Sequence, residues 1–347
     1  MAANTQAVWQ TGHVVEAAPA ATDIQRIVLR TERPRVAPPG SHVDVVVHTA
    51  DGTDTRSYSV VGGSRDGSEL TISVSLSPNS RGGSRFMHTL RPGDELRMTQ
   101  PLQNFPLRIG APRYLLLAGG VGITAIAAMA RALRHVKAAY TLVYVGRSRV
   151  RMAFLDELVE LHGDNIRVHV DDEGTSHDAG ALVDEAGTAP TELYMCGPIR
   201  LMDAIRRRWH DRGLPAADLR YETFGNSGWY ETEEFVVSVP RLGVETTVGS
   251  TRSLLEALEQ AGAEVISDCR KGECGLCQVR ILSVDGLIDH RDVFFSDEQK
   301  KTSGKMCVCV SRAVLDPGAA GGTLTGQNSP VRTRSTGRQA VLTVDIP

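Results

Sequence analysis

Residues 268–277, DCRKGECGLC, place three cysteines at a C-x4-C-x2-C spacing in a chain that contains only six cysteines. Gly272 and Gly275 stand between these cysteines and allow the backbone to curl around a bound group. Further along, MCVCVSRA supplies two more thiols, Cys307 and Cys309. A C-x4-C-x2-C run followed by a distant fourth cysteine is typical of a plant-type 2Fe-2S centre, whose irons need four thiolate ligands.

The three clustered thiols, Cys269, Cys274 and Cys277, are therefore candidate iron ligands. Zinc is the alternative, but structural zinc sites usually carry two C-x2-C pairs, and only one is present here. Counting residues does not choose the fourth ligand, because 29 residues separate Cys277 from Cys307 and 31 separate it from Cys309. On spacing alone, both stay open.

The composition is that of a globular protein with more than one domain. A chain of 347 residues exceeds the size at which one core keeps growing, so two or three domains are expected. The formal net charge of -3 argues against a nucleic-acid partner. The first residues lack a basic region followed by an apolar run, so we expect no secretory signal, a cytoplasmic location and reduced thiols.

One charge-free stretch, from Tyr114 to Ala130, could be mistaken for a membrane span. It is shorter than the roughly 20 residues that a spanning helix needs, and its glycines cluster in the middle. We expect a buried strand, a tight turn and a packed helix here, and no membrane association.

Three blocks of pattern follow one another along the chain. Residues 21–108 alternate apolar and polar residues between Pro and Gly turns, which predicts an antiparallel β-barrel. Residues 113–225 alternate apolar strands with amphipathic helices, which predicts an α/β doubly wound parallel sheet. The polar stretch 225–234 is expected as a linker to the third block. Within that block, 315–339 is expected as a long surface loop before a closing strand at 340–346.

The expected domains follow from these blocks. Residues 1–109 are expected to form the barrel domain and residues 110–226 the nucleotide-binding domain. Residues 227–347 are expected to form a smaller α+β domain that carries the cysteine loop.

RSYSVVG, at 56–62, and SRGGS, at 80–84, resemble the flavin-binding segments of ferredoxin reductase-like enzymes. In that family the tyrosine and serine lie against the isoalloxazine ring, and the arginine neutralises the flavin phosphate with its planar fork of donors. The glycines expose backbone amides that form an anion nest, although a plain hairpin turn explains them equally well in isolation. The flavin contacts that the resemblance implies are Arg56, Ser57, Tyr58, Ser59, Arg81, Gly82, Gly83 and Ser84.

AGGVGITA, at 118–125, follows a predicted strand and opens a predicted helix, where a pyrophosphate can meet the helix amides. It resembles the G-G-x-G-I-T-P segment of the same superfamily, with Ala125 where proline is usual. Losing that proline removes some rigidity at the helix start but no ligand atom. The nucleotide contacts implied here are Gly119, Gly120, Gly122, Ile123 and Thr124.

A second strand end, in YVGRSR, places Arg147 and Ser148 where the superfamily contacts the adenine-side ribose. The residues alone leave the nucleotide open. Arg147 and Arg149 favour NADPH, whereas the acidic turn 171–173 favours NADH. The family precedent favours NADH.

The residues expected at the reaction centre come from three separate segments. Cys196, followed by Gly197 and Pro198, lies in the superfamily beside the hydride-carrying carbon of nicotinamide, although a small buried hydrophobic residue is the alternative. Phe224 matches an aromatic residue that the family places against the flavin, with an ordinary core phenylalanine as the alternative. Together with Ser59 these are the candidate catalytic residues.

From about Thr22 to its end, the chain resembles the phthalate dioxygenase reductase family, which includes the vanillate demethylase reductases. The resemblance implies a β-grasp ferredoxin domain of the plant type, and FMN in preference to FAD. Within that domain the family pattern HRD...C-x-SRA matches residues 290–292 and 311–313. It places the fourth ligand at Cys309 and makes Cys307 a buried neighbour.

The resemblance implies the reductase component of a multicomponent oxygenase. A flavin reconciles NADH, which gives two electrons at once, with a 2Fe-2S cluster, which accepts one. The implied partner is a terminal oxygenase, either a Rieske non-haem iron enzyme or a haem-thiolate monooxygenase, that a monomer binds transiently through a small polar surface. Arg270, Lys271 and Glu273 are candidate contacts. A general NAD(P)H-ferredoxin reductase or diaphorase and a redox sensor are the alternatives.

Overall fold

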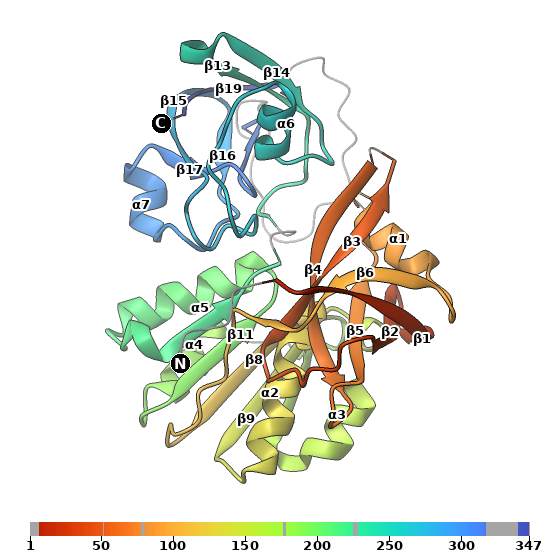
Figure 1. Cartoon of the computed structure of the whole chain (residues 1–347). Helices are drawn as coiled ribbons and strands as arrows, with labels where there is room; N and C mark the ends of the chain where they lie inside the picture. The colour runs from red at the N-terminus through yellow and green to blue at the C-terminus, as the bar shows by residue number, and fades with distance from the viewer. Residues whose placement is uncertain are drawn as a thin grey trace. The chain divides into compact units, whose positions relative to one another are not determined.

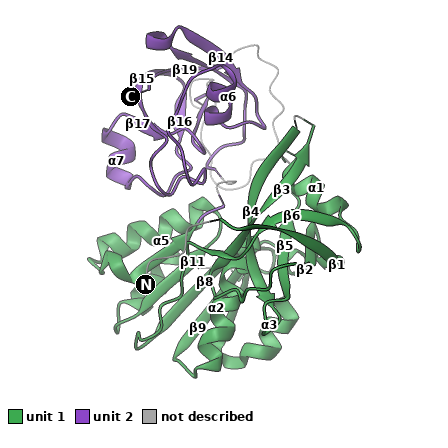
Figure 2. Cartoon of the chain, in the orientation of Figure 1, with its two compact units in different colours: residues 1–222 green, residues 223–347 purple. Residues whose placement is uncertain are grey.

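The computed structural model of the chain (Figure 1) describes residues 7–50, 52–77, 80, 82–175, 178–224, 228–316 and 339–346. The chain divides into two compact units, Met1–Glu222 and Thr223–Pro347, which Figure 2 colours separately. The domain boundaries expected at 109/110 and 226/227 stay predictions. None of the described helices has the length and apolar character needed to span a bilayer.

The N-terminal part of the first unit is an antiparallel barrel. Its strands pair in the order β4-β5-β2-β1-β6-β3-β7, and a further pairing of β3 with β4 closes the barrel. The strands are β1 (Trp9–Ala21), β2 (Ile24–Thr31), β3 (Ser41–Thr49), β4 (Gly52–Gly63), β5 (Glu69–Ser75), β6 (Glu95–Thr99) and β7 (Leu102–Gln103), and helix α1 (Gly83–Thr89) follows β5. The expected barrel fold is confirmed.

The period-two pattern of the barrel strands sorts their side chains onto two faces. On β3, Val43, Val45 and Val47 are fully buried and pack into the barrel core with Ile27 and Ile72. The residues between them point to the other face. On β4 this outward set includes Ser57 and Ser59, which pair across the strands with Asp44 and His42 respectively.

The rest of the first unit is a parallel sheet with the strand order β10-β9-β8-β11-β12, which is the doubly wound arrangement. Its strands are β8 (Tyr114–Gly119), β9 (Tyr140–Gly146), β10 (Ile166–Val170), β11 (Glu192–Cys196) and β12 (Leu219–Glu222). The helices are α2 (Ile123–His135), α3 (Leu155–His162), α4 (Ala179–Ala186) and α5 (Ile199–Asp211). The chain order reverses between β8 and β11, so the ligand crevice of such a sheet is expected at the carboxyl ends of these two strands.

The charge-free stretch from Tyr114 to Ala130 is the buried strand β8, a tight turn and the start of α2, as the sequence predicts. Helix α2 packs on β8, β9 and β11 and also contacts β4 of the barrel. Leu116, Leu117 and Ile126 are fully buried in this part of the unit. The helix that follows the glycine turn is therefore also the helix that meets the barrel.

The second unit is built on a five-stranded sheet with the order β14-β13-β19-β15-β17. Its strands are β13 (Phe235–Val239), β14 (Val244–Val248), β15 (Gln278–Asp285), β17 (Lys305–Cys307) and β19 (Ala340–Asp345). Helices α6 (Leu254–Gln260) and α7 (Asp297–Thr302) and a two-stranded sheet of β16 (Leu287–Asp289) and β18 (Arg312–Val314) complete the unit. The closing strand expected at 340–346 is β19, which pairs with β13 and β15 in the middle of the sheet. The loop expected at 315–339 lies mostly outside the described residues.

The described part of the expected linker is tied to the second unit. The carboxylate of Asp289, which is almost fully buried, accepts hydrogen bonds from the backbone N–H groups of Trp229 (3.0 Å) and Tyr230 (3.4 Å). Arg291 forms an ion pair with Asp289 (2.6 Å) and donates to the Tyr230 carbonyl (2.9 Å). Gly228 lies against the same guanidinium, since a Cβ atom there would be 2.3 Å from Arg291 Nε. Residues 228–230 are thus an integral part of this unit.

Candidate functional site

The two segments expected to bind flavin phosphate meet at the start of α1. A Cβ atom on Gly83 would lie 3.1 Å from Arg56 Cγ, so the arginine side chain of β4 lies directly over this glycine. The guanidinium is held by Asp54 (2.5 Å) and by the Thr55 carbonyl (3.0 Å). The first turn of a helix leaves backbone N–H groups without intrahelical partners. An arginine beside such a turn has the donor set that a phosphate requires.

Serine hydroxyls hold the turn before α1 in shape. Ser84 donates to the Ser80 hydroxyl (2.8 Å) and accepts from the Ser77 N–H (3.2 Å), while the Gly82 N–H donates to Ser80 (3.2 Å). The hydroxyl of Ser84 therefore has internal partners and shapes the turn. Arg81 lies outside the described residues.

Tyr58 and Ser57 have different surroundings on β4. Tyr58 is half-buried against the barrel core, and burial raises the pKa of its hydroxyl above the ordinary value. Ser57 donates to Asp44 Oδ1 at 2.6 Å, and Asp44 is also 3.8 Å from His42 Nε2. The outward face of the β3–β4 pair is thus polar beside the expected flavin position.

The third residue of this strand, Ser59, joins the barrel to the parallel sheet. Its hydroxyl donates to Glu222 Oε2 at 3.3 Å, and the two residues are only 6% and 4% exposed. Glu222 ends β12 directly opposite Cys196, which ends β11. The structure therefore brings the expected catalytic residues Ser59 and Cys196 to the same edge of the sheet, with Glu222 linking the two segments.

Sequence reasoning missed Glu222. In its segment, residues 221–226, the sequence analysis assigns a role to Phe224 alone. The available signal was an acidic residue at the end of the last predicted parallel strand, since carboxyl ends of such strands line the crevice. Phe224 itself is half-buried, belongs to the second unit, and its expected contact with flavin stays a prediction.

The glycine turn and the Cys196 segment touch at the point where the strand order reverses. A Cβ atom on Gly122 would lie 2.2 Å from the Cys196 carbonyl oxygen, so only glycine fits there. Gly120 has a φ of +53°, and a Cβ atom at this residue would meet nothing within 4 Å. The backbone at Gly120 is thus open, as a nucleotide pyrophosphate requires for close approach.

The remaining nucleotide residues flank this turn. Ile123 and Thr124 are buried in the first turn of α2, where the Thr124 hydroxyl donates to the Val121 carbonyl (2.9 Å). Gly197 and Pro198 pack against Gly119, because a Cβ atom on Gly119 would lie 2.7 Å from Pro198 Cδ. Strand ends β8 and β11 therefore form one continuous backbone surface.

Arg147 and Ser148 follow β9 at the same carboxyl edge. Arg147 is exposed, and its carbonyl accepts a hydrogen bond from the Asp172 N–H (3.1 Å). The neighbouring Arg149 makes a bidentate ion pair with Glu173, with N–O distances of 2.6 and 2.9 Å. The acidic turn 171–173 therefore neutralises one of the two arginines that could bind a 2'-phosphate.

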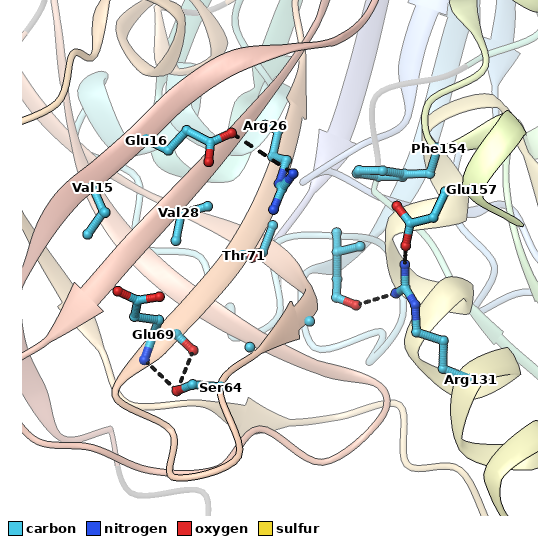
Figure 3. A pocket seen from close by; sticks show the side chains of 13 residues that line it. Val15, Glu16, Arg26, Val28, Ser64, Glu69, Thr71, Arg131, Phe154 and Glu157 are labelled. Carbon is cyan, nitrogen blue, oxygen red and sulfur yellow. Dashed lines mark hydrogen bonds and ion pairs between the residues drawn. The ribbon is translucent and has the colours of Figure 1, made fainter. Parts of the chain in front are cut away.

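A cavity of about 530 Å³ lies between the barrel strands and helices α2 and α3 (Figure 3). Arg131 of α2 forms an ion pair with Glu157 (2.6 Å) and donates to the Val61 carbonyl of β4 (3.0 Å). Glu16 and Arg26 pair at 3.9 Å on the barrel side. None of the expected cofactor contacts lines this cavity. At its edge, Arg131 joins strand β4, which carries the flavin segment, to helix α2, which follows the glycine turn.

The cysteine loop of the second unit surrounds the sulfur atom of Cys269 with amides. The backbone N–H groups of Lys271, Glu273 and Cys274 each lie 3.4 Å from Cys269 Sγ. Gly272 has a φ of +77°, which allows the loop to curl in this way. Amide donors around a sulfur stabilise a thiolate, so the loop fits an anionic iron-sulfur centre.

The thiols fall into two groups. Cys269 is within hydrogen-bonding reach of Cys274, and Cys277 is within reach of both Cys307 and Cys309. Among the residues that the structure describes, no three His, Cys, Asp or Glu side chains converge on a point where they could hold one metal ion. A group of two thiols and a group of three suit a binuclear cluster, in which each iron takes two protein ligands and one thiol of the larger group is not a ligand.

The two candidates for the fourth ligand differ in their surroundings. Cys309 accepts a backbone hydrogen bond from Gly272 of the cysteine loop, and both Cys277 and Cys269 influence it electrostatically. Cys307 is fully buried on β17, where it pairs with Gln278 of β15. The geometry favours Cys309, whose ligation stays a prediction.

Residues of the HRD segment (290–292) and the SRA segment (311–313) form hydrogen bonds next to the cysteine loop. Ser311 donates to Asp292 Oδ1 (3.1 Å), and the Phe295 N–H donates to Asp292 Oδ2 (2.9 Å). Asp292 and Ser311 are fully buried, and a Cβ atom on Gly272 would lie 2.9 Å from Asp292 Cα. The loop therefore rests on a buried polar network.

Two of the three expected partner contacts have internal partners. Arg270 forms a bidentate ion pair with Glu259 of α6, at 2.6 and 3.3 Å. Glu273 accepts the Thr223 N–H at 2.9 Å, and burial raises the pKa of its carboxyl group. Arg270 and Glu273 are therefore less available for docking than the sequence indicates. The sequence analysis predicted neither the Arg270–Glu259 ion pair nor the Glu273–Thr223 hydrogen bond.

Comparisons with known proteins match most of the chain. Residues 238–314 match the family model described as "2Fe-2S iron-sulfur cluster binding domain". The chain is 34% identical over 277 residues to the carnitine monooxygenase reductase subunit of Escherichia coli, covering 79% of this chain and 85% of the relative. It is 35% identical over 269 residues to phthalate dioxygenase reductase of Burkholderia cepacia, covering 74% and 80%.

Two solved structures are similar over almost the whole chain. A phthalate dioxygenase reductase, described as a modular structure for electron transfer from pyridine nucleotides to [2Fe-2S], has a TM-score of 0.66 at 29% identity. The match covers 97% of this chain and 98% of that one. An intact type IV self-sufficient cytochrome P450 monooxygenase has a TM-score of 0.61 at 32% identity and covers 98% of this chain. This chain spans only 41% of that longer protein.

Proposed function

The chain belongs to the phthalate dioxygenase reductase family, and from this premise we infer that it is the reductase component of a multicomponent oxygenase. It is an NADH-dependent oxidoreductase that uses FMN and a plant-type 2Fe-2S cluster. One observation carries this conclusion. The chain contains the β4 flavin strand, then the Gly122–Cys196 contact and then the amide-lined cysteine loop, which is the order of these features in the family.

When bound, the flavin supplies the exchange between the electron pair of NADH and the single electron that the cluster accepts. Arg56 holds the flavin phosphate together with the turn of Gly82, Gly83 and Ser84. Tyr58, Ser57 and Ser59 orient the ring. Ser59 is anchored by Glu222, and both are almost inaccessible to water, so this part of the site keeps one geometry.

The nucleotide lies along the carboxyl edge of the parallel sheet. Gly119, Gly120 and Gly122 let the pyrophosphate approach the backbone that leads into α2, where Ile123 and Thr124 begin the helix. Arg147 and Ser148 contact the ribose on the adenine side. Cys196, with Gly197 and Pro198, borders the nicotinamide, and Phe224 is proposed as the aromatic residue against the flavin.

Cys269, Cys274, Cys277 and Cys309 hold the cluster. The three amides that face Cys269 Sγ stabilise negative charge on that sulfur. The buried Asp292 and Ser311 keep the loop in place beneath it.

The electron acceptor is an oxygenase. We propose a Rieske non-haem iron enzyme or a haem-thiolate monooxygenase, because the similar proteins include a phthalate dioxygenase reductase and a self-sufficient cytochrome P450 monooxygenase. We propose further that the reductase is a cytoplasmic monomer and that the complex is transient, since a carrier must release its acceptor after each transfer.

Reconstitution with a purified candidate oxygenase tests this function. Product should form with NADH only when this reductase is present, and oxygenases of both classes should be tried. Reduction of cytochrome c alone does not discriminate, because a general diaphorase also carries it out. Failure of product formation with every oxygenase encoded in the same genome, despite normal diaphorase activity, would contradict the proposal.

The Arg149–Glu173 ion pair predicts a change of nucleotide preference. Glu173→Gln should free the Arg149 guanidinium for a 2'-phosphate, and the ratio of kcat/KM for NADPH to that for NADH should rise about tenfold. Because the pair is exposed, its loss should change stability little. Steady-state kinetics with both nucleotides measure the ratio.

A matched control exists on the same sheet. Arg167 and Glu185 form a second bidentate pair, with distances of 2.6 and 3.1 Å, between β10 and α4. Glu185→Gln should leave the ratio unchanged. An equal rise in both variants, or none in Glu173→Gln, would show that Glu173 does not set the preference.

A further inference from the structure

We propose that Cys307, the thiol of its group that does not bind iron, donates a hydrogen bond to Cys277 Sγ and thereby raises the reduction potential of the cluster. This inference rests on the proposed function, in which Cys277 and Cys309 are ligands. The step concerned is the gain of one electron from the reduced flavin, in which one ferric ion of the cluster becomes ferrous and no bond to the protein forms or breaks.

Three thiols of the second unit meet at Cys277. Its sulfur atom lies within hydrogen-bonding reach of both Cys307 and Cys309, and the backbone N–H of Cys309 is a further donor to it. Because four ligands complete a binuclear cluster, one of these three thiols has no iron to bind. Cys309 accepts a hydrogen bond from Gly272 of the cysteine loop, so on this assignment Cys307 is the thiol left over.

The contact between Cys307 and Cys277 is shielded from water. Cys307 is fully buried, and Cys277 is only 3% exposed. An ordinary thiol is protonated at neutral pH, and burial in apolar surroundings favours this form. Cys307 therefore has one S–H donor, and the sulfur of Cys277 is an acceptor within its reach.

Backbone hydrogen bonds hold the two residues next to each other. The Val308 N–H donates to the Cys277 carbonyl at 3.2 Å, and the Ser311 N–H donates to the Cys307 carbonyl at 3.0 Å. Cys277 directly precedes β15 and Cys307 ends β17, where it pairs with Gln278. The pairing of these two strands therefore brings the two thiols together.

A donor at this position favours the reduced cluster. Hydrogen bonds to the sulfur ligands are among the factors that set the potential of an iron-sulfur cluster. A donor beside a thiolate sulfur offsets its negative charge, and the negative charge of the cluster grows when it takes up an electron. Three backbone amides surround Cys269 Sγ in the same way, but only a side-chain donor such as Cys307 can be removed by substitution.

The test is a redox titration of the purified full chain with mediators, in which the EPR signal of the reduced cluster is measured. In Cys307→Ala, the equilibrium constant for reduction should fall about tenfold, which lowers the midpoint potential by about 59 mV for one electron. Cys307→Ser retains a donor at this position, so it should recover most of that shift. The iron content of both variants should equal that of the wild type.

Val308→Ala is the matched control. Val308 is also fully buried and belongs to the same core as Cys307, so this variant leaves a small cavity without removing a donor. Its midpoint potential should equal that of the wild type. An unchanged potential in Cys307→Ala, or an equal shift in Val308→Ala or in Cys307→Ser, would overturn the proposal.

The remaining outcomes are also decisive. If Cys307→Ala folds but contains no iron, Cys307 is a ligand and the proposal is overturned. If Cys307→Ala does not fold, the pair Cys307→Thr and Cys307→Val decides, because the two side chains have the same shape and only threonine carries a donor. Equal potentials in that pair overturn the proposal. If the wild type itself gives no EPR signal after reduction with dithionite, it is the proposed function that has failed.

Discussion

Replacing Cys309 with alanine is expected to abolish the visible absorption of the iron-sulfur cluster, whereas Cys307→Ala is expected to retain it. The Cys309 sulfur accepts a hydrogen bond from Gly272 of the cysteine loop and lies near Cys277. Without it one iron would keep a single protein thiolate, and a cluster with three of its four ligands is not stably held. Absorption spectra and iron content of the purified variants measure the effect.

Cys307→Ala is the internal control, because it removes a fully buried thiol only two residues away. The small cavity that this variant leaves should lower the free energy of unfolding by about 1 kcal/mol, and the cluster should stay in place. The flavin should remain bound in both variants. A wild-type spectrum in Cys309→Ala together with cluster loss in Cys307→Ala would reverse the assignment.

Ser59→Ala is expected to slow the reduction of the flavin by NADH about 100-fold, since small misplacement of reacting groups costs that much. The Ser59 hydroxyl is bonded to the buried Glu222, which is opposite Cys196 in the sheet. Removing the hydroxyl breaks the bond between the flavin strand and the nucleotide edge. It also leaves a buried carboxylate without this donor. Stopped-flow absorbance of the flavin gives the rate.

Ser73→Ala is the matched control for this prediction. Ser73 is a buried serine on the neighbouring strand β5, and its hydroxyl has no hydrogen-bond partner among the described residues. The variant should reduce its flavin at the wild-type rate. Glu222→Gln should fall between Ser59→Ala and the wild type, because an amide oxygen can still accept the hydroxyl hydrogen. A wild-type rate in Ser59→Ala would remove Ser59 from the reaction centre.

The fold could be predicted from the sequence because buried positions recur at a regular spacing along each strand and helix, and these positions carry apolar residues. Val43, Val45 and Val47 alternate with polar residues and point into the barrel, as the period-two pattern predicts. The strand-glycine-helix run of 114–135 predicted β8, the turn and α2 within a few residues. The cysteine spacing pointed to the ferredoxin-type second unit, which the match of residues 238–314 supports.

The contacts that complete the site were not readable, because they depend on long-range pairing. Ser59 and Glu222 are 163 residues apart, and only the closed barrel and the sheet order bring them together. Glu273 looked like an exposed docking residue, whereas its carboxylate binds the Thr223 amide. The polar, glycine-containing stretch 225–234 looked like a linker, but Asp289 and Arg291 bind its described residues 229 and 230. Composition reports polarity, and it does not report which buried partner satisfies that polarity.

The central claim is that electrons pass from NADH through a flavin to an iron-sulfur cluster within this one chain. Anaerobic titration of the purified protein with NADH tests it most directly. The absorption of both flavin and cluster should bleach, and the end point should come at about 1.5 NADH per chain, which is two electrons for the flavin and one for the cluster. Bleaching of the flavin alone, or a colourless protein that does not react with NADH, would contradict the claim.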